Sequence, residues 1–215
     1  MGQVVIAVRG GPAAKSRLAA VLGPEERATL TALMLHDMLD AVDRAPRVSG
    51  VWVVTPTAEL AALARSLGVE VVEQLEPGGL NAAFRQALAV VGDAAPYDAV
   101  ALLPGDLPLL EPGDLDAALA LAEAHEVVLA PAMDGGTGAL VIRAGATFAP
   151  EFGADSFAVH QDQVHRRGLS LAVVDAMSLS RDLDRPEDVA FLLAAAPHGR
   201  TALYLSERSA RLTPP

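Results

Sequence analysis

The sequence predicts an α/β fold with three layers, in which a mostly parallel central sheet is covered by helices on both faces. Apolar runs of strand length alternate with helical segments, an order typical of parallel βαβ units. The clearest run, residues 98–103, is apolar almost throughout, as in a strand buried on both faces, and it stops at Pro104 and Gly105. With 215 residues, of which 52% are hydrophobic, the chain is large enough to bury one substantial core.

The first half of the chain supplies the regular alternation of strands and helices. We expect strands over residues 3–8, 51–54 and 69–72, and helices over residues 24–44, over residues 57–67 and from about Leu80 onward. Pro24 suits the first turn of a helix, and the two glutamates that follow it are favourable at a helix amino end.

The second half continues the same pattern with shorter elements. We expect helices over residues 112–124, in the polar segment after Phe157 and from Pro186 onward, and strands over residues 127–130, 139–143 and 169–175. The whole is expected to be one domain over residues 1–196, with residues 197–215 forming a tail or a packing arm.

Composition limits the kind of protein. The formal net charge of -11 argues against non-specific binding to nucleic acid or to an anionic membrane, because either needs a basic surface. The absence of cysteine excludes disulfides and thiolate metal sites. No apolar run approaches the ~18 to 20 residues of a spanning helix, and no export signal precedes the first strand. We therefore expect a cytoplasmic protein; a homo-oligomer is compatible with the sequence, which does not specify the oligomeric state.

Asp106 directly follows the buried run of residues 98–103. The carboxyl edge of the strands is where open α/β sheets bind their ligands, so Asp106 is a candidate site residue. The structural alternative is a Gly-Asp turn in which Asp106 caps the next helix.

A basic, glycine-containing loop follows the first strand and contains Arg9, Gly10, Lys15 and Arg17. Such a loop at the end of a buried strand can bind phosphate oxygens. It is not a Walker P-loop, because Ala14 stands where that motif needs glycine, and no Gly-x-Gly-x-x-Gly occurs in the chain. A solvated flexible loop is the alternative.

Three further positions have both a structural and a functional interpretation. Asn81, near a helix start, is expected to be a cap, although it is also placed to read a base or a ribose. Thr137 lies in a Gly-Thr-Gly turn that is either a plain hairpin or an anion site. Ser156 is expected to bind an anion near a helix amino end, since no Gly-x-Ser-x-Gly elbow surrounds it. His160 and His165 are five residues apart and are not expected to share a metal.

Asp182 and Asp184 are two residues apart, so in an extended segment their carboxylates point the same way and can converge on one cation. Asp184 has an alternative role as the cap of the helix that begins at Pro186. Phosphate oxygens, carboxylates and water are the ligands that Mg²⁺ prefers. Together with the basic loop, the three aspartates suit nucleotidyl transfer.

A set of motifs in a fixed order resembles one enzyme family. These motifs are Ala-Lys-Ser-Arg-Leu, Leu-Asn-Ala-Ala, Gly-Asp-Leu-Pro, Gly-Thr-Gly, Phe-Gly-Ala-Asp-Ser and Asp-Leu-Asp-Arg-Pro-Glu-Asp, between about residues 3 and 195. They resemble the guanylyltransferases of coenzyme F-420 biosynthesis. That family has a glycosyltransferase-A-like fold and transfers GMP from GTP to 2-phospho-L-lactate, phosphoenolpyruvate or 3-phospho-D-glycerate.

The resemblance implies roles for individual residues. The implied Mg²⁺ ligands are Asp106, Asp182 and Asp184, which are catalytic together with Lys15. Thr137, Gly153 and Ser156 would hold the acceptor acid. The implied GTP-binding residues are Arg9, Gly10, Lys15, Arg17 and Asn81.

The sequence departs from the family pattern at two places in the basic loop. Arg9 and the two glycines after it stand where the family more often has a lysine and bulkier residues, and Ser16 replaces a commoner threonine. Two alternatives stay open at this stage. One is another nucleotidyltransferase of similar fold, such as a molybdenum-cofactor guanylyltransferase, and the other is a nucleotide-binding regulatory module without catalysis.

Overall fold

The computed structural model describes residues 1–11, 13–74, 78–96, 98–196 and 198–208. In these ranges one sheet contains the strands β1 (Gly2–Ala7), β2 (Val48–Thr55), β3 (Glu70–Glu73), β4 (Ala99–Pro104), β5 (Val127–Pro131), β6 (Thr137–Ile142) and β7 (Leu171–Val173). The helices are α1 (Pro24–Asp43), α2 (Ala58–Ser66), α3 (Gly79–Ala94), α4 (Pro112–Leu121), α5 (Ser156–Arg167), α6 (Met177–Ser180), α7 (Pro186–Ala195), α8 (Arg200–Ser206) and the 3-10 helix η1 (Ser16–Leu18).

The sheet is mostly parallel, as the sequence predicts. Its strand order is β3-β2-β1-β4-β6-β5-β7. Every neighbouring pair is parallel except those of β6, which runs antiparallel to both β4 and β5. The turn between β5 and β6 makes them a hairpin, so the hairpin interpretation of the Gly-Thr-Gly segment is confirmed for the backbone.

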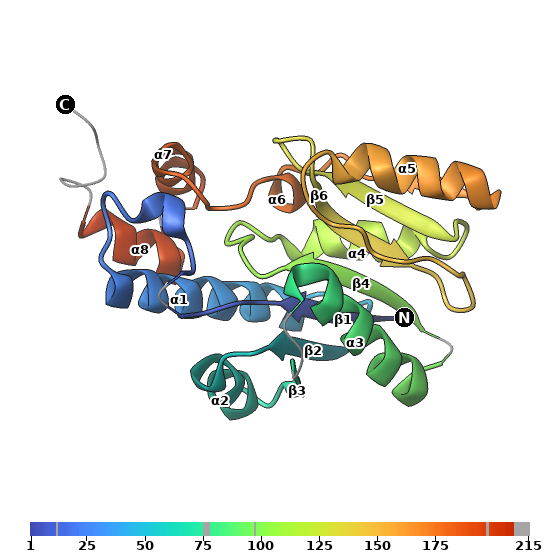
Figure 1. Cartoon of the computed structure of the whole chain (residues 1–215), viewed down its shortest axis with the longest axis horizontal. Coiled ribbons are helices and arrows are strands. Elements are labelled where there is room, and N and C mark those ends of the chain that lie inside the picture. The colour runs from blue at the N-terminus through green and yellow to red at the C-terminus, as the bar shows by residue number, and fades with distance from the viewer. Residues whose placement is uncertain (12, 75–77, 97, 197, 209–215) are drawn as a thin grey trace.

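Helices cover both faces of this sheet, which confirms the three layers (Figure 1). One face packs against α1, α2, α4 and α6, with Ile6 and Met38 among the core residues. The other packs against α3 and α5, where Phe84 is fully buried. Alternate residues of β1 point to opposite faces: Val5 joins the second core and Ile6 the first.

A third apolar cluster lies at one end of the molecule and joins the outer side of α1 to η1, α7 and α8 (Figure 1). Ala202 and Leu205 of α8 are fully buried in it. The Asp37 carboxylate accepts hydrogen bonds from the amides of Arg200 and Thr201, which satisfies the first amides of α8. The described part of the segment from residue 197 onward is thus packed on α1.

Two α-helices in the described ranges were not expected from the sequence, α6 and α8. Both are short, with 4 and 7 residues, or about one and two turns, so neither repeats an apolar pattern often enough to be recognised in the sequence. Among the described residues, no helix combines the length and the apolar character needed to cross a membrane.

Candidate active site

Two adjoining cavities open at the carboxyl edge of β1 and β4. The first, of about 330 Å³, is lined by Arg9 and Lys15 from the basic loop and by Asp184. The second, of about 210 Å³, is lined by Thr137, Ser156 and Asp182, among others. Leu80, Pro104 and Asp106 line both cavities. We call the first the loop cavity and the second the hairpin cavity. Asp106 lies where they meet.

Asp106 is held at this junction by the backbone around it. The Gly105 amide donates to the Ala7 carbonyl at 2.8 Å, and a Cβ at Gly105 would press on Val8. The Asp106 carbonyl accepts from the Leu183 amide at 3.0 Å, which ties the end of β4 to the segment of the other two aspartates. The next helix, α4, has Glu111 at its N-cap. The alternative in which Asp106 caps that helix is therefore wrong.

Lys15 neutralises one side of Asp106. Its Nζ donates to Asp106 Oδ2 at 2.7 Å and lies 3.8 Å from Asp184 Oδ1. Lys15 adopts a left-handed backbone conformation, with φ of 51°. The buried Arg27 fixes the loop there, because its Nε donates to the Ala14 carbonyl at 3.0 Å and its Nη1 to the Leu22 carbonyl at 2.8 Å.

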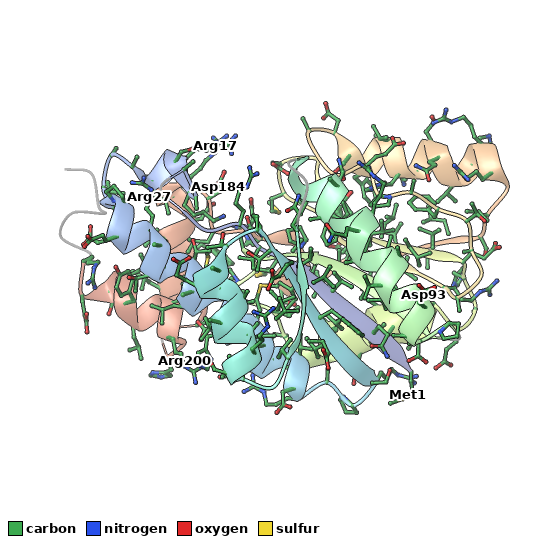
Figure 2. All side chains as sticks on the ribbon, turned by 60° about the horizontal axis from the view of Figure 1, so that its bottom comes forward. Met1, Arg17, Arg27, Asp93, Asp184 and Arg200 are labelled. Atoms are coloured by element: carbon green, nitrogen blue, oxygen red, sulfur yellow. The ribbon has the colours of Figure 1, made fainter. Side chains whose placement is uncertain are left out.

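Asp182 and Asp184 flank Leu183, which is buried in the third cluster, so both carboxylates face away from that cluster. They line different cavities, Asp182 the hairpin cavity and Asp184 the loop cavity. Asp184 pairs with Arg17, and Figure 2 shows these two side chains on the same rim of the molecule. The amides of Asp184 and Arg185 donate to Asp188, so Asp188 and not Asp184 caps α7.

The electrostatics differ sharply between the aspartates. Burial, and after it the negative charge of Asp106, raise the pKa of Asp182 to about 6, against an opposing effect of Lys15. One oxygen of Asp106, Oδ1, is buried and has no hydrogen-bond partner among the residues that the structure describes. Two neighbouring carboxylates, one with an unused buried oxygen, form a place that favours a cation.

The three aspartates do not form a ready-made metal site. In the described ranges no group of three or more His, Cys, Asp or Glu side chains is arranged to hold a metal ion. Lys15 pairs with Asp106 and Arg17 with Asp184. Asp106 and Asp182 keep the donor chemistry of a Mg²⁺ site that uses one or two carboxylates together with phosphate oxygens.

The hairpin cavity combines a turn, a loop and a helix start. Thr137 Oγ1 lies 3.1 Å from Ser156 Oγ and 2.9 Å from Nδ1 of His160. Gly153 lines the same cavity in a positive-φ conformation, with φ of 148°. The three residues that the resemblance assigns to the acceptor therefore lie together, at the amino end of α5.

The residues expected to bind the nucleotide are spread more widely. Arg9 and Lys15 line the loop cavity, whereas Gly10, Arg17 and Asn81 do not line it. The Gly10 amide donates to Thr57 Oγ1 at 3.0 Å. The role of Asn81 as a helix cap is wrong, because Gly78 is the N-cap of α3. Its amide instead exchanges two hydrogen bonds with the backbone of Phe152, at 2.7 and 2.8 Å, and so fastens the loop before α5.

Sequence reasoning missed Arg27 and His160. Arg27 lies inside a long helix, where nothing in the sequence marks a buried arginine. His160 had a usable signal: it is four residues after Ser156, so the two share one face of a helix. His160 and His165 lie in different environments, as their five-residue spacing predicted: His160 is buried and His165 is exposed.

Comparison with solved structures defines the class. The fold matches a nucleotide-diphospho-sugar transferase of Desulfovibrio desulfuricans G20 with a TM-score of 0.81 and 20% identity, over 99% of this chain and 97% of that one. It also matches CMP:2-keto-3-deoxy-manno-octonic acid synthetase in complex with CTP, with a TM-score of 0.60 and 14% identity, over 96% and 100% of the chains. The fold is thus that of the nucleotide-diphospho-sugar transferases and nucleotidyltransferases, as the resemblance implied.

Sequence comparison then gives the family. The family described as Guanylyl transferase CofC like matches residues 2–212, so the match extends past the residue 195 expected from the motifs. The chain belongs to this family of coenzyme F-420 biosynthesis, and it is a guanylyltransferase, a nucleotidyltransferase enzyme. This finding sets aside the molybdenum-cofactor enzyme and the regulatory module.

Curated relatives share most of the chain. A 3-phospho-D-glycerate guanylyltransferase of Phenylobacterium zucineum is 54% identical over 98% of both chains. A 2-phospho-L-lactate guanylyltransferase of Methanothermobacter thermautotrophicus is 36% identical over 82% of this chain and 77% of its own. A phosphoenolpyruvate guanylyltransferase of Sphaerobacter thermophilus is 36% identical over 92% and 95% of the two chains.

Proposed function

We propose that this guanylyltransferase transfers GMP from GTP to 3-phospho-D-glycerate and releases pyrophosphate, as a step of coenzyme F-420 biosynthesis. The observation that supports a two-substrate transfer is the position of Asp106, which lines both the loop cavity and the hairpin cavity. The choice of acceptor follows the 54% identity to the Phenylobacterium zucineum enzyme, against 36% to the relatives named for the other two acids.

The loop cavity is the proposed site of GTP. Its volume of about 330 Å³ lies in the usual range for a small-molecule site. Lys15 and the exposed Arg9 bring positive charge to a protein that is otherwise strongly acidic. Arg17 lies beside them through its ion pair with Asp184, at the rim. These cations are placed to meet the triphosphate, and the aliphatic part of the cavity near Leu80 and Ala83 is available to the nucleoside.

The hairpin cavity is the proposed site of the acceptor. A phosphorylated three-carbon acid carries a phosphate and a carboxylate. Thr137 and Ser156 offer hydroxyl groups at the amino end of α5, where backbone dipoles favour an anion. With the carboxylate held there, the phosphate is left for the side of the cavity that Asp106 shares with the loop cavity.

The proposed reaction is an in-line displacement at the α-phosphorus of GTP. An oxygen of the acceptor phosphate forms a new bond to that phosphorus, the bond from the α-phosphorus to the bridging oxygen breaks, and its electron pair leaves with pyrophosphate. A phosphate monoester is already ionised near neutral pH, so the step needs alignment and charge neutralisation more than a strong base. Lys15 supplies a fixed positive charge next to Asp106, where the two substrates would meet.

We further propose Mg²⁺ as the cofactor, with Asp106 and Asp182 as its protein ligands and Asp184 near it. The support is the unpartnered Oδ1 of Asp106, and the burial of Asp182 next to the negative charge of Asp106, which together raise the pKa of Asp182. When bound, the ion would neutralise charge on the phosphates. The protein residues would then orient the two phosphates on either side of Asp106.

A panel of acceptors tests the proposal. Purified protein is incubated with GTP, Mg²⁺ and either 3-phospho-D-glycerate, phosphoenolpyruvate or 2-phospho-L-lactate, and pyrophosphate release is measured. We expect the highest kcat/KM with 3-phospho-D-glycerate. A higher value with another of the three acids would overturn the acceptor, and no release with any of them would overturn the reaction.

A further inference from the structure

His160 is fully buried, and the proposed reaction gives it no chemical role. It lies on α5 between the rings of Phe148 and Phe152, with ring centroids 5.7 and 5.4 Å away. Both of its ring nitrogens nevertheless make hydrogen bonds: Nε2 to the amide of Glu151 and Nδ1 to Thr137 Oγ1, each at 2.9 Å. Since Thr137 lines the hairpin cavity, the ring is one step away from the acceptor site.

The backbone fixes which ring nitrogen of His160 carries the proton. The Glu151 amide can only donate, so Nε2 has to be an acceptor without a proton. Burial lowers the pKa of His160 to about 4, so the ring is neutral near pH 7. A neutral ring with a bare Nε2 carries its proton on Nδ1 and donates it to Thr137 Oγ1.

The Glu151 amide is itself held in place by the same helix. Gln163 Oε1 accepts from the Ala149 amide at 3.0 Å, and Gln163 Nε2 donates to the Ala149 carbonyl at 3.1 Å. On the other side, Asn81 holds both backbone groups of Phe152. The loop that sets the His160 tautomer is thus anchored on both sides of Glu151.

This tautomer decides what the hydroxyl pair of Thr137 and Ser156 presents to the cavity. The two hydroxyl groups carry one hydrogen each. One of these hydrogens forms the bond between them, whichever hydroxyl is the donor. Because His160 donates to Thr137, the second hydrogen is not needed for the ring. With the opposite tautomer, Thr137 would have to donate to Nδ1 and the pair would keep no hydrogen for a ligand.

We propose that His160 is a positioning residue that makes the Thr137–Ser156 pair a hydrogen-bond donor to an anionic oxygen of the acceptor acid. The inference rests on the proposed function, in which this cavity holds the acceptor. The pair selects an ionised carboxylate over a neutral or donor group, because a buried hydroxyl without an acceptor is costly. His160 itself touches no substrate.

Three variants of His160 separate this role from simple packing. In His160→Asn the side-chain amide lies where Nδ1 was and can still donate to Thr137. In His160→Gln the amide oxygen reaches the place of Nε2 and can accept from Glu151, but the donor to Thr137 is lost. His160→Phe fills the aromatic space and loses both bonds. His165→Gln, at an exposed position of the same helix, is the matched control.

The expected result is a split between the two substrates. His160→Gln and His160→Phe should raise the KM for 3-phospho-D-glycerate by about 10-fold or more, since one hydrogen bond to a charged group is affected. The KM for GTP should change less than about twofold, because His160 does not contact the loop cavity, where GTP is proposed to bind. His160→Asn should recover most of the acceptor affinity, and His165→Gln should match the unmodified enzyme. The positioning role would be overturned if all three His160 variants lost the same acceptor affinity and this loss paralleled their fall in melting temperature.

A second measurement reads the tautomer directly. Long-range ¹H–¹⁵N correlation spectra of the protein with ¹⁵N-labelled histidine should show His160 with Nδ1 protonated and Nε2 bare near pH 7. A protonated Nε2 would overturn the inference. If the unmodified enzyme is inactive with all three acids while His160 shows the expected tautomer, the proposed function fails by itself. If the enzyme is active and the His160 variants leave the acceptor KM unchanged, only the inference fails.

Discussion

The two cavities are built by opposite means. The wall of the loop cavity is charged: Lys15 pairs with Asp106 and Arg17 with Asp184, across 91 and 167 residues of the chain. The hairpin cavity is also lined by Asp106 and Asp182, but its Thr137 and Ser156 side belongs to a buried cluster that neutral hydrogen bonds join to His160. Ion pairs hold the basic loop of the first cavity, whereas neutral hydrogen bonds between buried side chains hold the Thr137 and Ser156 side of the second.

This difference matches the two ligands that we propose. A triphosphate is large and highly charged, and the cations Arg9, Lys15 and Arg17 offer it several charged partners. A three-carbon acid is small, so its recognition depends on a few groups in fixed positions, where a missing partner costs most. Replacing a residue of one wall should therefore affect one substrate, and replacing Asp106 should affect both.

The largest effect is expected at Asp106. Asp106→Asn removes the charge at the junction of the cavities and leaves Lys15 without its partner. We expect kcat/KM to fall by about 10²- to 10³-fold, the range seen when one preorganised charge-stabilising group is removed. Steady-state pyrophosphate release measures this, with circular dichroism to show that the fold persists. Asp93→Asn, at the exposed far end of α3, is the control (Figure 2). Near-normal turnover in Asp106→Asn would mean that the carboxylate is only structural.

The buried cluster of Thr137, Ser156 and His160 should respond to acid through His160. Its pKa in the folded state is about 4, below the ordinary 6.5, so between these values the unfolded chain binds a proton that the native state does not. The free energy of unfolding should fall by about 3 kcal/mol as the pH drops from 6.5 to 4. Urea unfolding of the unmodified protein and of His160→Gln, at pH 7 and pH 4.5, measures the difference. If the free energy of unfolding falls by the same amount between pH 7 and pH 4.5 in both proteins, the assignment of this pH dependence to His160 is contradicted.

Gly138 connects the hairpin to the segment that carries Asp182. A Cβ there would overlap the Leu179 carbonyl oxygen of α6, so Gly138→Ala has to move α6. We expect a loss of about 1 to 3 kcal/mol in the free energy of unfolding, with a fall in kcat because Asp182 follows α6 directly. Gly92→Ala is the matched control: it lies in α3 with open space around it and should stabilise the protein by about 1 kcal/mol. Equal stability of the two variants, measured by urea unfolding, would be inconsistent with this contact.

Asp182 should show the opposite pH response to His160. Its folded-state pKa of about 6 lies above the ordinary 3.8, so its stabilising contribution is complete below pH 3.8 and is lost as the pH rises through 6. Asp182→Asn should therefore stabilise the ligand-free protein by about 1 to 2 kcal/mol at pH 7.5, allowing for partial solvent screening, and by almost nothing at pH 4. Melting temperatures at the two pH values test this. A destabilised variant at pH 7.5 would show that the carboxylate makes a favourable contact instead.

The sequence predicts the sheet better than the site. The buried run before Asp106 has only one good interpretation, because few other elements are apolar on both faces, and it also places Asp106 at the ligand edge. Asn81 and Asp184 were ambiguous for a local reason: a polar residue near a helix start looks like a cap whatever its side chain contacts. In the structure, Gly78 is the N-cap of α3, and in α7 the N-cap is Arg185 while the Asp188 side chain accepts the capping hydrogen bonds.

Other parts of the site depend on contacts that no local pattern carries. The ammonium of Lys15 lies between two aspartates from different segments, a contact that the sequence does not indicate. The role of His160 depends on one backbone amide nine residues before it and on a threonine from a neighbouring strand. Only the fold brings these groups together.

The central claim is that the loop cavity binds GTP and the hairpin cavity binds the acceptor acid. Two variants test it most directly, Arg9→Ala in the loop cavity and Thr137→Val in the hairpin cavity. KM values for GTP and for 3-phospho-D-glycerate are measured for both. We expect Arg9→Ala to raise the KM for GTP and Thr137→Val to raise the KM for the acid, each by about 10-fold, with the other KM nearly unchanged. If Thr137→Val raises both KM values equally, or Arg9→Ala raises only that of the acid, the two cavities do not hold the substrates as proposed.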